Sequence, residues 1–320
     1  MIDYFDNIYT KIENRNKLLS RLKYYAFLRF VIKILVNFFA PIYFFATRNK
    51  KEYSIANNKE INNKSSKVIV TLTSFPARIN RVCLVIETIF RQTQKPDQII
   101  LWLSKEQFPT LEILPPRLLG QQKRGLEIRL VDGDLKSHKK YYYSLHEFPN
   151  DIMITIDDDI FYRSKMIEDL YNYSCRFPKN VIAQYCKQIT WNENRLSPHI
   201  MWPIKYEEII NSDSLFFGTG GGTLFPPHSF YPYVLNKELF MALTPTADDV
   251  WLNTMCKLNQ TKVTQTTYNT DRLPVLNKEK ISLALVNNSK FQNDIQLNAV
   301  REYFIKKKNL NPYASPRMEA

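Results

Sequence analysis

Three consecutive aspartates stand directly after a short and strongly apolar run. The run is Ile152–Ile156, and the aspartates are Asp157, Asp158 and Asp159. Adjacent carboxylates repel one another unless water or a cation relieves the repulsion. Magnesium and manganese prefer carboxylate and phosphate oxygens, so a strand that ends in D-x-D offers a metal cradle where a diphosphate would sit. The alternative is a solvated acidic turn that closes the strand.

A cluster of glycines is the second feature that could form part of a functional site. The whole chain has 7 glycines, and four of them lie in the stretch Gly218-Thr219-Gly220-Gly221-Gly222. Glycine lets the backbone approach a ligand closely or adopt a positive φ. The spacing matches neither a P-loop nor a dinucleotide fingerprint. A surface turn is the alternative, although the apolar residues on both sides argue against a loose linker.

A pair of aspartates opens a predicted helix further along the chain. Asp248 and Asp249 precede the apolar run Val250–Leu252. The structural interpretation makes Thr246 the N-cap and Asp249 the acidic member of a variant capping box. The catalytic interpretation is compatible with it, because a cap also fixes a carboxylate in place. The residues alone leave both open.

A loop rich in cations follows the third predicted strand. It runs from Asp132 to Lys140 and includes Lys136 and Lys139. Lysine ammonium groups are point charges that can bind a diphosphate. A solvated run of charges is the alternative.

Alternating strands and helices must position these features. The predicted strands are Val68–Leu72, Gln98–Leu103, Leu126–Leu130 and Ile152–Ile156, and the predicted helices include Val82–Phe90 and Lys139–Phe148. This alternation predicts βαβ units, and therefore an α/β fold with a mostly parallel central sheet flanked by helices. Ligands bind such sheets beyond the carboxyl ends of the strands, which is where the aspartate triplet and the lysine loop fall.

The first fifty residues differ from the rest. Tyr24–Ala46 is strongly apolar, but Arg29, Lys33 and Asn37 recur at steps of four and therefore share one face of a helix. Two cations near its middle argue against a membrane-spanning segment, and Pro41 would kink or end the helix. We expect a basic amphipathic helix that lies in the membrane interface. The alternative is a helix packed on the protein's own core.

The net charge of +13 calls for an anionic partner. Lysine and arginine are dense in Lys11–Lys51 and Lys306–Lys308, whereas the middle of the chain is nearly balanced. This distribution favours an anionic membrane surface over nucleic acid, because no basic stripe interleaved with aromatic residues crosses the core. The 4 cysteines form no C-x-x-C pair and stand in apolar runs, so we expect reduced core residues.

Taken together, these stretches resemble a bacterial glycosyltransferase of the GT-A fold, similar to the family 2 enzymes of surface-polysaccharide biosynthesis. The stretches that carry the resemblance are Thr71–Arg78, Ile99–Ser104, Asp134–Ser137, Ile156–Ile160, the glycine cluster and Ala247–Leu252. Their order and spacing, from about Lys67 to Leu258, are more specific than any one of them. The resemblance implies a GT-A-like nucleotide-diphospho-sugar transferase fold, a nucleotide-sugar donor, and Mn²⁺ or Mg²⁺ as cofactor.

The resemblance also implies roles for individual residues. With the lysine loop included, the expected donor-binding and nucleotide-binding residues are Thr73, Ser74, Phe75, Arg78, Lys136, Lys139, Lys140, Asp157 and Asp158. Asp159 and Asp157 would bind the metal. The residues bordering the donor sugar and the acceptor would be Gly220, Gly221, Gly222 and Trp251. Asp249, or else Asp248, would be the general base that deprotonates the acceptor hydroxyl.

The chain also departs from the family pattern. Many family 2 members carry an acidic residue that contacts the base after the second strand, where this chain has Ser104, so the nucleotide base stays open. For a third metal ligand, His228 is only a guess. The expected reaction is one direct displacement, which inverts the anomeric centre.

The expected organisation is a membrane-associating helical segment (1–56), a linker (57–66), a GT-A catalytic domain (67–275) and a helical C-terminal extension with a basic tail (276–320). Asn293 and Asp294 would start the C-terminal helix, to which we assign no chemistry. The protein would be cytoplasmic, peripheral to the inner face of the cell membrane, with a saccharide or lipid-linked saccharide as acceptor. The rival functions are a metal-dependent nucleotidyltransferase and a membrane-associated carbohydrate-binding or scaffold protein.

Overall fold

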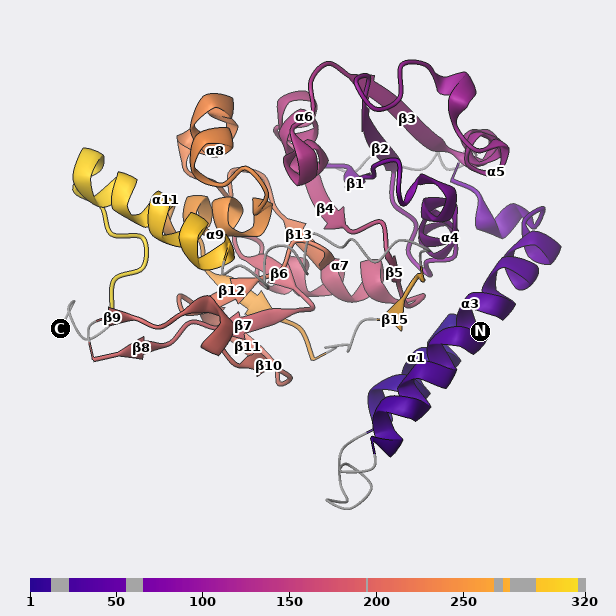
Figure 1. Cartoon of the computed structure of the whole chain (residues 1–320), viewed down its shortest axis with the longest axis horizontal. Coiled ribbons are helices and arrows are strands. Elements are labelled where there is room, and N and C mark those ends of the chain that lie inside the picture. The colour runs from indigo at the N-terminus through magenta and orange to yellow at the C-terminus, as the bar shows by residue number, and fades with distance from the viewer. Residues whose placement is uncertain (13–22, 56–65, 194, 268–272, 277–291, 316–320) are drawn as a thin grey trace.

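An eight-stranded sheet runs through the molecule and carries helices on both faces (Figure 1). The computed structural model describes residues 1–12, 23–55, 66–193, 195–267, 273–276 and 292–315. The strands of this sheet are β1 (Val68–Thr73), β2 (Gln98–Ser104), β3 (Leu126–Val131), β4 (Ile152–Ile156), β6 (Val181–Ala183), β11 (Ile209–Ser212), β13 (Gly221–Phe225) and β14 (Val263–Gln265).

The strand order in the sheet is β11-β14-β6-β13-β4-β1-β2-β3. β1 pairs in parallel with β2 and β4, β2 pairs in parallel with β3, and β6 pairs in parallel with β14. β13 and β11 are antiparallel to their neighbours. The predicted α/β fold, with a mostly parallel central sheet flanked by helices, is therefore confirmed.

Short strands and helices surround this sheet. The remaining strands are β5 (Ile160–Phe161), β7 (Cys186–Gln188), β8 (Trp191–Asn192), β9 (Arg195–Leu196), β10 (Ile204–Lys205), β12 (Leu215–Phe217) and β15 (Leu273–Pro274). The α-helices are α1 (Ile2–Lys11), α3 (Tyr24–Thr47), α4 (Ile79–Phe90), α5 (Pro116–Leu119), α6 (Lys139–Glu147), α7 (Met166–Arg176), α8 (Lys237–Leu243), α9 (Asp248–Leu258) and α11 (Gln292–Lys308). The short 3₁₀ helices are η1 (Lys51–Tyr53), η3 (Leu111–Ile113), η4 (Gly120–Arg124), η5 (Lys136–His138), η6 (His199–Met201) and η7 (Pro232–Leu235).

Two apolar cores lie on opposite faces of the sheet, because successive side chains of a strand point to opposite sides. In β1, Val68, Val70 and Leu72 join the core that contains α4 and α7, whereas Ile69 packs with Trp102 on the other face. The second large core contains residues of α6, α8, α9 and α11. The predicted apolar stripe of α4 is fully buried in the first core.

The helix α3 lies along one side of the molecule with α1 beside it (Figure 1). It runs through Pro41 to Thr47, so of the two expectations, that Pro41 would kink or end the helix, the second is wrong. The buried positions Ile32, Val36, Ala40 and Phe44 recur every four residues. Packing of this stripe against the protein compensates for the backbone hydrogen bond that proline removes.

The cationic stripe of α3 faces the protein. The Arg29 guanidinium lies 5.3 Å and the Lys33 ammonium 5.6 Å from the centre of the Tyr9 ring on α1. The outward face is apolar as a result, with exposed residues that include Phe27, Phe30, Ile34, Phe38, Ile42 and Phe45. By length and composition alone α3 could cross a membrane, with a mean hydropathy of 1.8.

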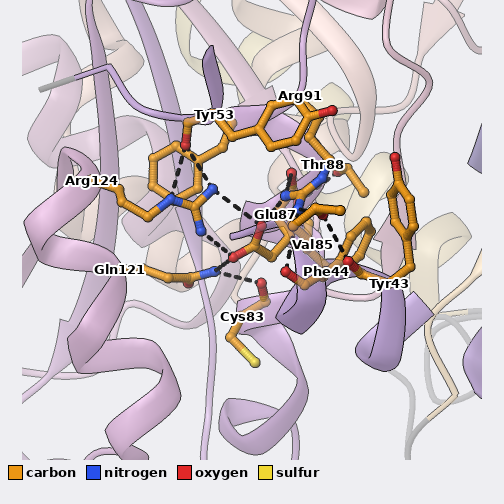
Figure 2. Close-up of polar contacts among 12 residues, drawn as sticks. Tyr43, Phe44, Tyr53, Cys83, Val85, Glu87, Thr88, Arg91, Gln121 and Arg124 are labelled. Carbon is orange, nitrogen blue, oxygen red and sulfur yellow. Dashed lines mark hydrogen bonds and ion pairs between the residues drawn. The ribbon is translucent and has the colours of Figure 1, made fainter. Parts of the chain in front are cut away.

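A buried ion network links the end of α3 to α4 and η4 (Figure 2). Glu87 on α4 is 7% exposed and forms ion pairs with Arg91 and Arg124. Arg91 Nη2 donates to Thr47 Oγ1 over 2.8 Å, and Arg124 Nε donates to Tyr53 O over 2.9 Å. A buried carboxylate between two guanidinium groups is costly to disrupt, so this network fixes where α3 ends.

Three smaller expectations have different outcomes. Cys83, Cys186 and Cys256 are buried as expected, but Cys175 is exposed on α7. The helix predicted near the C-terminus is present as α11. Most of the expected linker 57–66, and much of the start of the extension 276–320, lie outside the described residues.

Candidate active site

A cavity of about 410 Å³ opens at the carboxyl ends of β1 and β4. Its lining comes from parts of the chain that are far apart in sequence. The lining residues are Thr73, Ser74, Phe75, Arg78, Gln107, Asp134, Lys136, Ser137, Lys139, Lys140, Ile156, Asp157, Asp158, Asp159, Tyr185, Lys187, His199, Phe216, Gly218, Thr219, Gly220, Thr246, Asp248, Asp249 and Asn293. The parallel sheet therefore brings the aspartate triplet, the lysine loop, the glycine cluster and the second aspartate pair to one place.

The turn after β1 is braced against the aspartate triplet. Ser74 Oγ donates to Asp158 Oδ2 over 2.6 Å, and Arg78 Nη1 donates to Asp158 Oδ1 over 2.7 Å. Arg78 Nη2 also pairs with Asp159 Oδ2 at 2.9 Å. Burial raises the pKa of Asp158 even though Arg78 and Ser74 oppose the shift. Asp158 thus positions the turn, and Asp157 and Asp159 remain the more exposed members of the triplet.

A buried lysine joins the aspartate triplet to the aspartate pair of α9. Lys140 Nζ lies 2.8 Å from Asp157 Oδ1 and 3.1 Å from Asp248 Oδ2, and it donates to Thr219 Oγ1 over 3.1 Å. Thr219 Oγ1 in turn donates to Asp248 Oδ2 over 2.7 Å. Burial alone would lower the pKa of Lys140, but Asp157 and Asp248 outweigh it and raise the pKa. Lys140 is therefore charged and enclosed, and it holds two carboxylates rather than reaching out to a diphosphate.

The other two cations of the loop differ from Lys140. Lys139 is buried and forms an ion pair with Asp134. Lys136 is exposed at the cavity with a φ of 51°, and its backbone N–H donates to Asp134 Oδ1 over 2.9 Å. Of the three expected diphosphate-binding lysines, Lys136 is the one placed to meet a ligand from solvent.

A neutral histidine fixes the segment that leads into α9. Burial lowers the pKa of His138 to about 4. Its Nε2 lies 2.6 Å from Thr244 O, which can only accept, so Nε2 carries the proton and Nδ1 accepts from the Tyr141 hydroxyl at 2.9 Å. The His138 ring also stacks on Phe240. The start of α9 is thereby tied to the lysine loop.

The expected capping box at α9 is wrong. The N-cap is Ala247, and no side chain caps the helix. Thr246 instead bonds Gln296 of α11 through its N–H at 3.0 Å. Asp248 and Asp249 are the first two residues of α9, and Asp249 Oδ1 accepts from Val250 N over 2.9 Å.

The pKa values of the two aspartates of α9 are shifted in opposite directions. Burial raises the pKa of Asp248, but the charge of Lys140 and the hydrogen bond from Thr219 outweigh it, so the pKa is lowered. Burial first, and then the neighbouring charge of Asp248, raise the pKa of Asp249 to about 6. A carboxylate with a raised pKa at a cavity is suited to accept a proton. Asp249 is therefore the general-base candidate, whereas Asp248 is held by Lys140 and Thr219.

A tyrosine joins the aspartate triplet to the glycine cluster. The Tyr162 hydroxyl accepts from Asp157 N at 2.8 Å and donates to Gly220 O at 2.6 Å. A Cβ on Gly220 would stand 1.6 Å from Asp157 Oδ2, so only glycine leaves that carboxylate in place. Gly222 has a φ of +89°, at the bulge where β13 meets β4. Gly220 thus allows close approach to a carboxylate of the chain itself, and Gly222 adopts the positive φ that was one of the two expectations.

No protein-family model and no curated protein sequence matches this chain. The structure of S. aureus TarS 1–349 in complex with UDP is 11% identical to it, with a TM-score of 0.44 over 76% of this chain and 73% of that one. Mannosyltransferase PcManGT from Pyrobaculum calidifontis, in complex with GDP-Man and Mn²⁺, is 12% identical, with a TM-score of 0.47 over 89% and 76%. A 4-diphosphocytidyl-2C-methyl-D-erythritol synthase from Anaerococcus prevotii is 13% identical, with a TM-score of 0.41 over 71% and 96%. At these identities the likeness is one of fold alone.

Asp157 and Asp159 fit the chemistry of a divalent ion. Their side chains are 33% and 30% exposed in the cavity. Among the described residues, no three His, Cys, Asp or Glu side chains are grouped so that they could hold a metal by themselves. Mg²⁺ is usually held by only one or two carboxylates together with substrate phosphates and waters. The pair is therefore a sufficient protein contribution, with Arg78 and Lys140 as its present partners.

The structure leaves four of the named residues outside the cavity lining. Gly221 and Gly222 lie in β13, and Trp251 is buried in the core, where Nε1 donates to Val234 O over 2.9 Å. Trp251 follows Asp249 by two positions on a helix, so it points to the opposite side. His228, the guess for a third ligand, also lies outside the lining.

Sequence reasoning missed several residues of the site. The further lining residues without an expected role include Gln107, Tyr185, Lys187, His199 and Asn293. Gln107 Oε1 is buried with no hydrogen-bond partner among the described residues, whereas Gln107 Nε2 donates to Asp134 Oδ2 over 2.8 Å. Asn293 is the second residue of α11 and lines the cavity, whereas Asp294, the other member of the pair noted in the sequence, is not among the lining residues.

Proposed function

We propose that this chain is a glycosyltransferase that moves a sugar from a nucleotide-sugar donor to a saccharide or lipid-linked saccharide, as in the making of surface polysaccharides. The observation that carries the proposal is the meeting of two carboxylate sets around one cavity. Asp157 and Asp159 can hold a divalent ion, and Asp249 has a pKa raised to about 6 by burial and by Asp248. A binding or scaffold protein has no use for such a base.

The residues divide the reaction between them. The turn from Thr73 to Arg78 and the exposed Lys136 bind the nucleoside diphosphate. Asp249 takes the proton of the acceptor hydroxyl while that oxygen bonds to the anomeric carbon. The bond from this carbon to the diphosphate oxygen breaks, and its electron pair leaves with the nucleoside diphosphate. Mn²⁺ or Mg²⁺ at Asp157 and Asp159 would supply neutralisation of the charge on that leaving group.

A single displacement inverts the anomeric centre. Retention by a double displacement needs a second carboxylate that can act as nucleophile. Within the described part of the chain, Asp249 is the cavity carboxylate without an ion pair to lysine or arginine. We therefore propose inversion.

The test is a panel of nucleotide sugars with Mg²⁺ or Mn²⁺, comparing the wild-type chain with Asp159→Ala. We expect one donor to release nucleoside diphosphate in a metal-dependent reaction that Asp159→Ala reduces at least 100-fold. Asp213→Ala is the matched control, because the Asp213 side chain is exposed and forms an ion pair with exposed Lys262, away from the cavity lining.

The products separate the proposed function from its rivals. Release of pyrophosphate from a nucleoside triphosphate and a sugar phosphate would indicate a nucleotidyltransferase. If the folded protein releases no nucleotide, and calorimetry detects no nucleotide binding in the presence of metal, the proposed transferase function is overturned. The binding or scaffold hypothesis then stands.

We further propose that α3 binds the inner leaflet of the cell membrane, so that the protein is cytoplasmic and peripheral. Phe27, Phe30 and Phe38 are each more than half exposed on its outward face. Lys23 and Arg48 flank the helix and are exposed, so they can meet anionic headgroups. The opposite face is occupied by the protein itself, which supports a helix lying along the surface rather than across the bilayer.

Replacing Phe27, Phe30 and Phe38 together by serine is expected to reduce co-sedimentation with phosphatidylglycerol-containing vesicles more than 10-fold. Burying one phenylalanine contributes roughly 1.5–3 kcal/mol. Ile113→Ser is the control, because Ile113 is equally exposed but lies in the catalytic part. Release of nucleoside diphosphate from a soluble donor should not change. Equal pelleting of the triple variant and the wild type would overturn the membrane role.

A further inference from the structure

The backbone just after the aspartate triplet is held by a strand from much later in the chain. β15 pairs antiparallel with β5, with Leu273 opposite Phe161 and Pro274 opposite Ile160. Val275 N donates to Asp159 O over 2.8 Å. Leu273 and Val275 are buried at this position. The main chain of Asp159 is thus fixed by a partner outside its own loop.

At the other edge of β15, the Asn37 side chain of α3 forms hydrogen bonds with the backbone. Asn37 Nδ2 donates to Pro274 O over 2.9 Å, and Asn37 Oδ1 accepts from Leu276 N over 2.8 Å. Successive residues of a strand direct their backbone groups to opposite edges. Val275 therefore bonds toward β5, while Pro274 and Leu276 bond toward α3. The Asn37 amide takes the place that a neighbouring strand would take.

The hydrogen bonds of the Asn37 amide fix its orientation. Its Nδ2 also donates to Lys33 O over 2.8 Å, within α3. A rotation of the amide by half a turn would set an NH₂ group against Leu276 N–H and an oxygen against Pro274 O. Figure 1 shows β5 and β15 on the side of the molecule that α3 covers. The chain of contacts is continuous from α3 through β15 to Asp159.

We propose that Asn37 is a positioning residue for the aspartate triplet, acting through β15 on the backbone of Asp159. α3 then positions the proposed metal site in addition to its proposed role at the membrane. The Asp159 carboxylate pairs with Arg78 at 2.9 Å, and small displacements of a ligand-bearing backbone weaken metal sites strongly. The role in metal binding rests on the proposed function, whereas the mechanical link to Asp159 does not.

The test compares Asn37→Leu with the full-length wild-type chain. Leucine has a similar size and a good helix propensity, but it leaves Pro274 O and Leu276 N–H without their partner. We expect faster hydrogen exchange in peptides covering residues 157–162 and 273–276. We also expect roughly 10-fold weaker Mn²⁺ binding in the presence of the nucleoside diphosphate. Both are measured well below the unfolding temperature.

Thr47→Val is the matched control on the same helix. It removes the hydrogen bond from Arg91 at the end of α3 but leaves Asn37 in place. We expect neither the exchange of residues 157–162 nor the Mn²⁺ affinity to change. If Thr47→Val had the same effect as Asn37→Leu, general loosening of α3 would explain both, and the specific role of Asn37 would be overturned.

Asn37→Asp keeps the test decisive if the leucine variant does not fold. It keeps an acceptor for Leu276 N and loses the donor to Pro274 O, so an intermediate increase in exchange is expected. Unchanged exchange of residues 157–162 in a folded Asn37 variant would overturn the proposal. If the wild-type chain binds no Mn²⁺ with nucleotide, the proposed function fails, and the exchange measurement still decides the positioning role.

Discussion

Replacing Asp249 by asparagine is expected to lower the rate of sugar transfer by roughly 10²–10⁴-fold. The amide keeps the shape of the side chain but cannot accept the acceptor's proton. Metal-dependent nucleotide binding should persist, because Asp249 is not among the proposed metal ligands. Glu238→Gln is the matched control: it removes an exposed carboxylate from the first turn of α8 and should leave the rate unchanged.

The pH dependence follows from the same carboxylate. Burial and Asp248 raise the pKa of Asp249 to about 6. The wild-type rate should therefore rise as the pH passes through about 6 and then level off, and the residual rate of Asp249→Asn should lack this limb. A flat wild-type profile between pH 5 and 7 would contradict the assignment.

Stability should move in the opposite direction to activity. A carboxyl whose pKa is higher in the folded than in the unfolded chain binds its proton more tightly when folded, so its charge destabilises the fold above the folded pKa. Asp249→Asn should therefore unfold at an equal or higher temperature than wild type at pH 7.5, with no difference near pH 4. A clear loss of stability at pH 7.5 would indicate a structural role for Asp249.

Replacing Lys140 by methionine is expected to lower the free energy of unfolding by about 3–5 kcal/mol at pH 7. Methionine fills the space but leaves Asp157 and Asp248 without their shared cation, and Asp248 is only 6% exposed. Sugar transfer should also fall, because Asp157 loses the contact that holds it beside Gly220. Urea unfolding and the donor-release assay measure the two effects.

The loss in Lys140→Met should shrink as the pH falls. Burial opposes ionisation of Asp248, but Lys140 lowers its pKa in the wild type, so this carboxylate contributes stability above its unfolded pKa that is lost as the pH falls through the lowered folded pKa. Without Lys140 the buried carboxylate protonates at a higher pH, so the advantage of the wild type shrinks below the pKa of Asp248 in the variant and is lost only below its lowered pKa in the wild type. Lys262→Met is the control, since Lys262 is exposed and pairs with exposed Asp213. An equal loss of unfolding free energy in Lys262→Met would show that the buried ion pairs of Lys140 contribute no more than an exposed one.

The central sheet and much of the cavity could be predicted because their signals are local. The apolar run of β4 and the charged residues after it are contiguous, and parallel strands bring their carboxyl ends to one edge. The nine expected donor-binding residues all line the cavity for this reason. Trp251 does not, because helical rotation over two residues turned it into the core.

Contacts between distant segments could not be predicted in the same way. Tyr162 carries no sequence signal for its bonds to Asp157 and Gly220. Thr246 looked like a cap, but Gln296, fifty residues further along, provides its partner. The polar stripe of α3 looked solvent-facing, and Asn37 bonds residues more than 200 positions away.

The order of strands and helices, the carboxylates at the strand end and the glycines near Asp157 follow from local sequence. They depend on periodicity, on side-chain type and on neighbours within a few residues. The opposite pKa shifts of the two aspartates of α9 arise from the tertiary structure. Asp248 and Asp249 are adjacent and chemically identical, but Lys140 and Thr219 engage one of them and leave the other with a raised pKa. That difference depends on three segments meeting in space, and no local pattern encodes it.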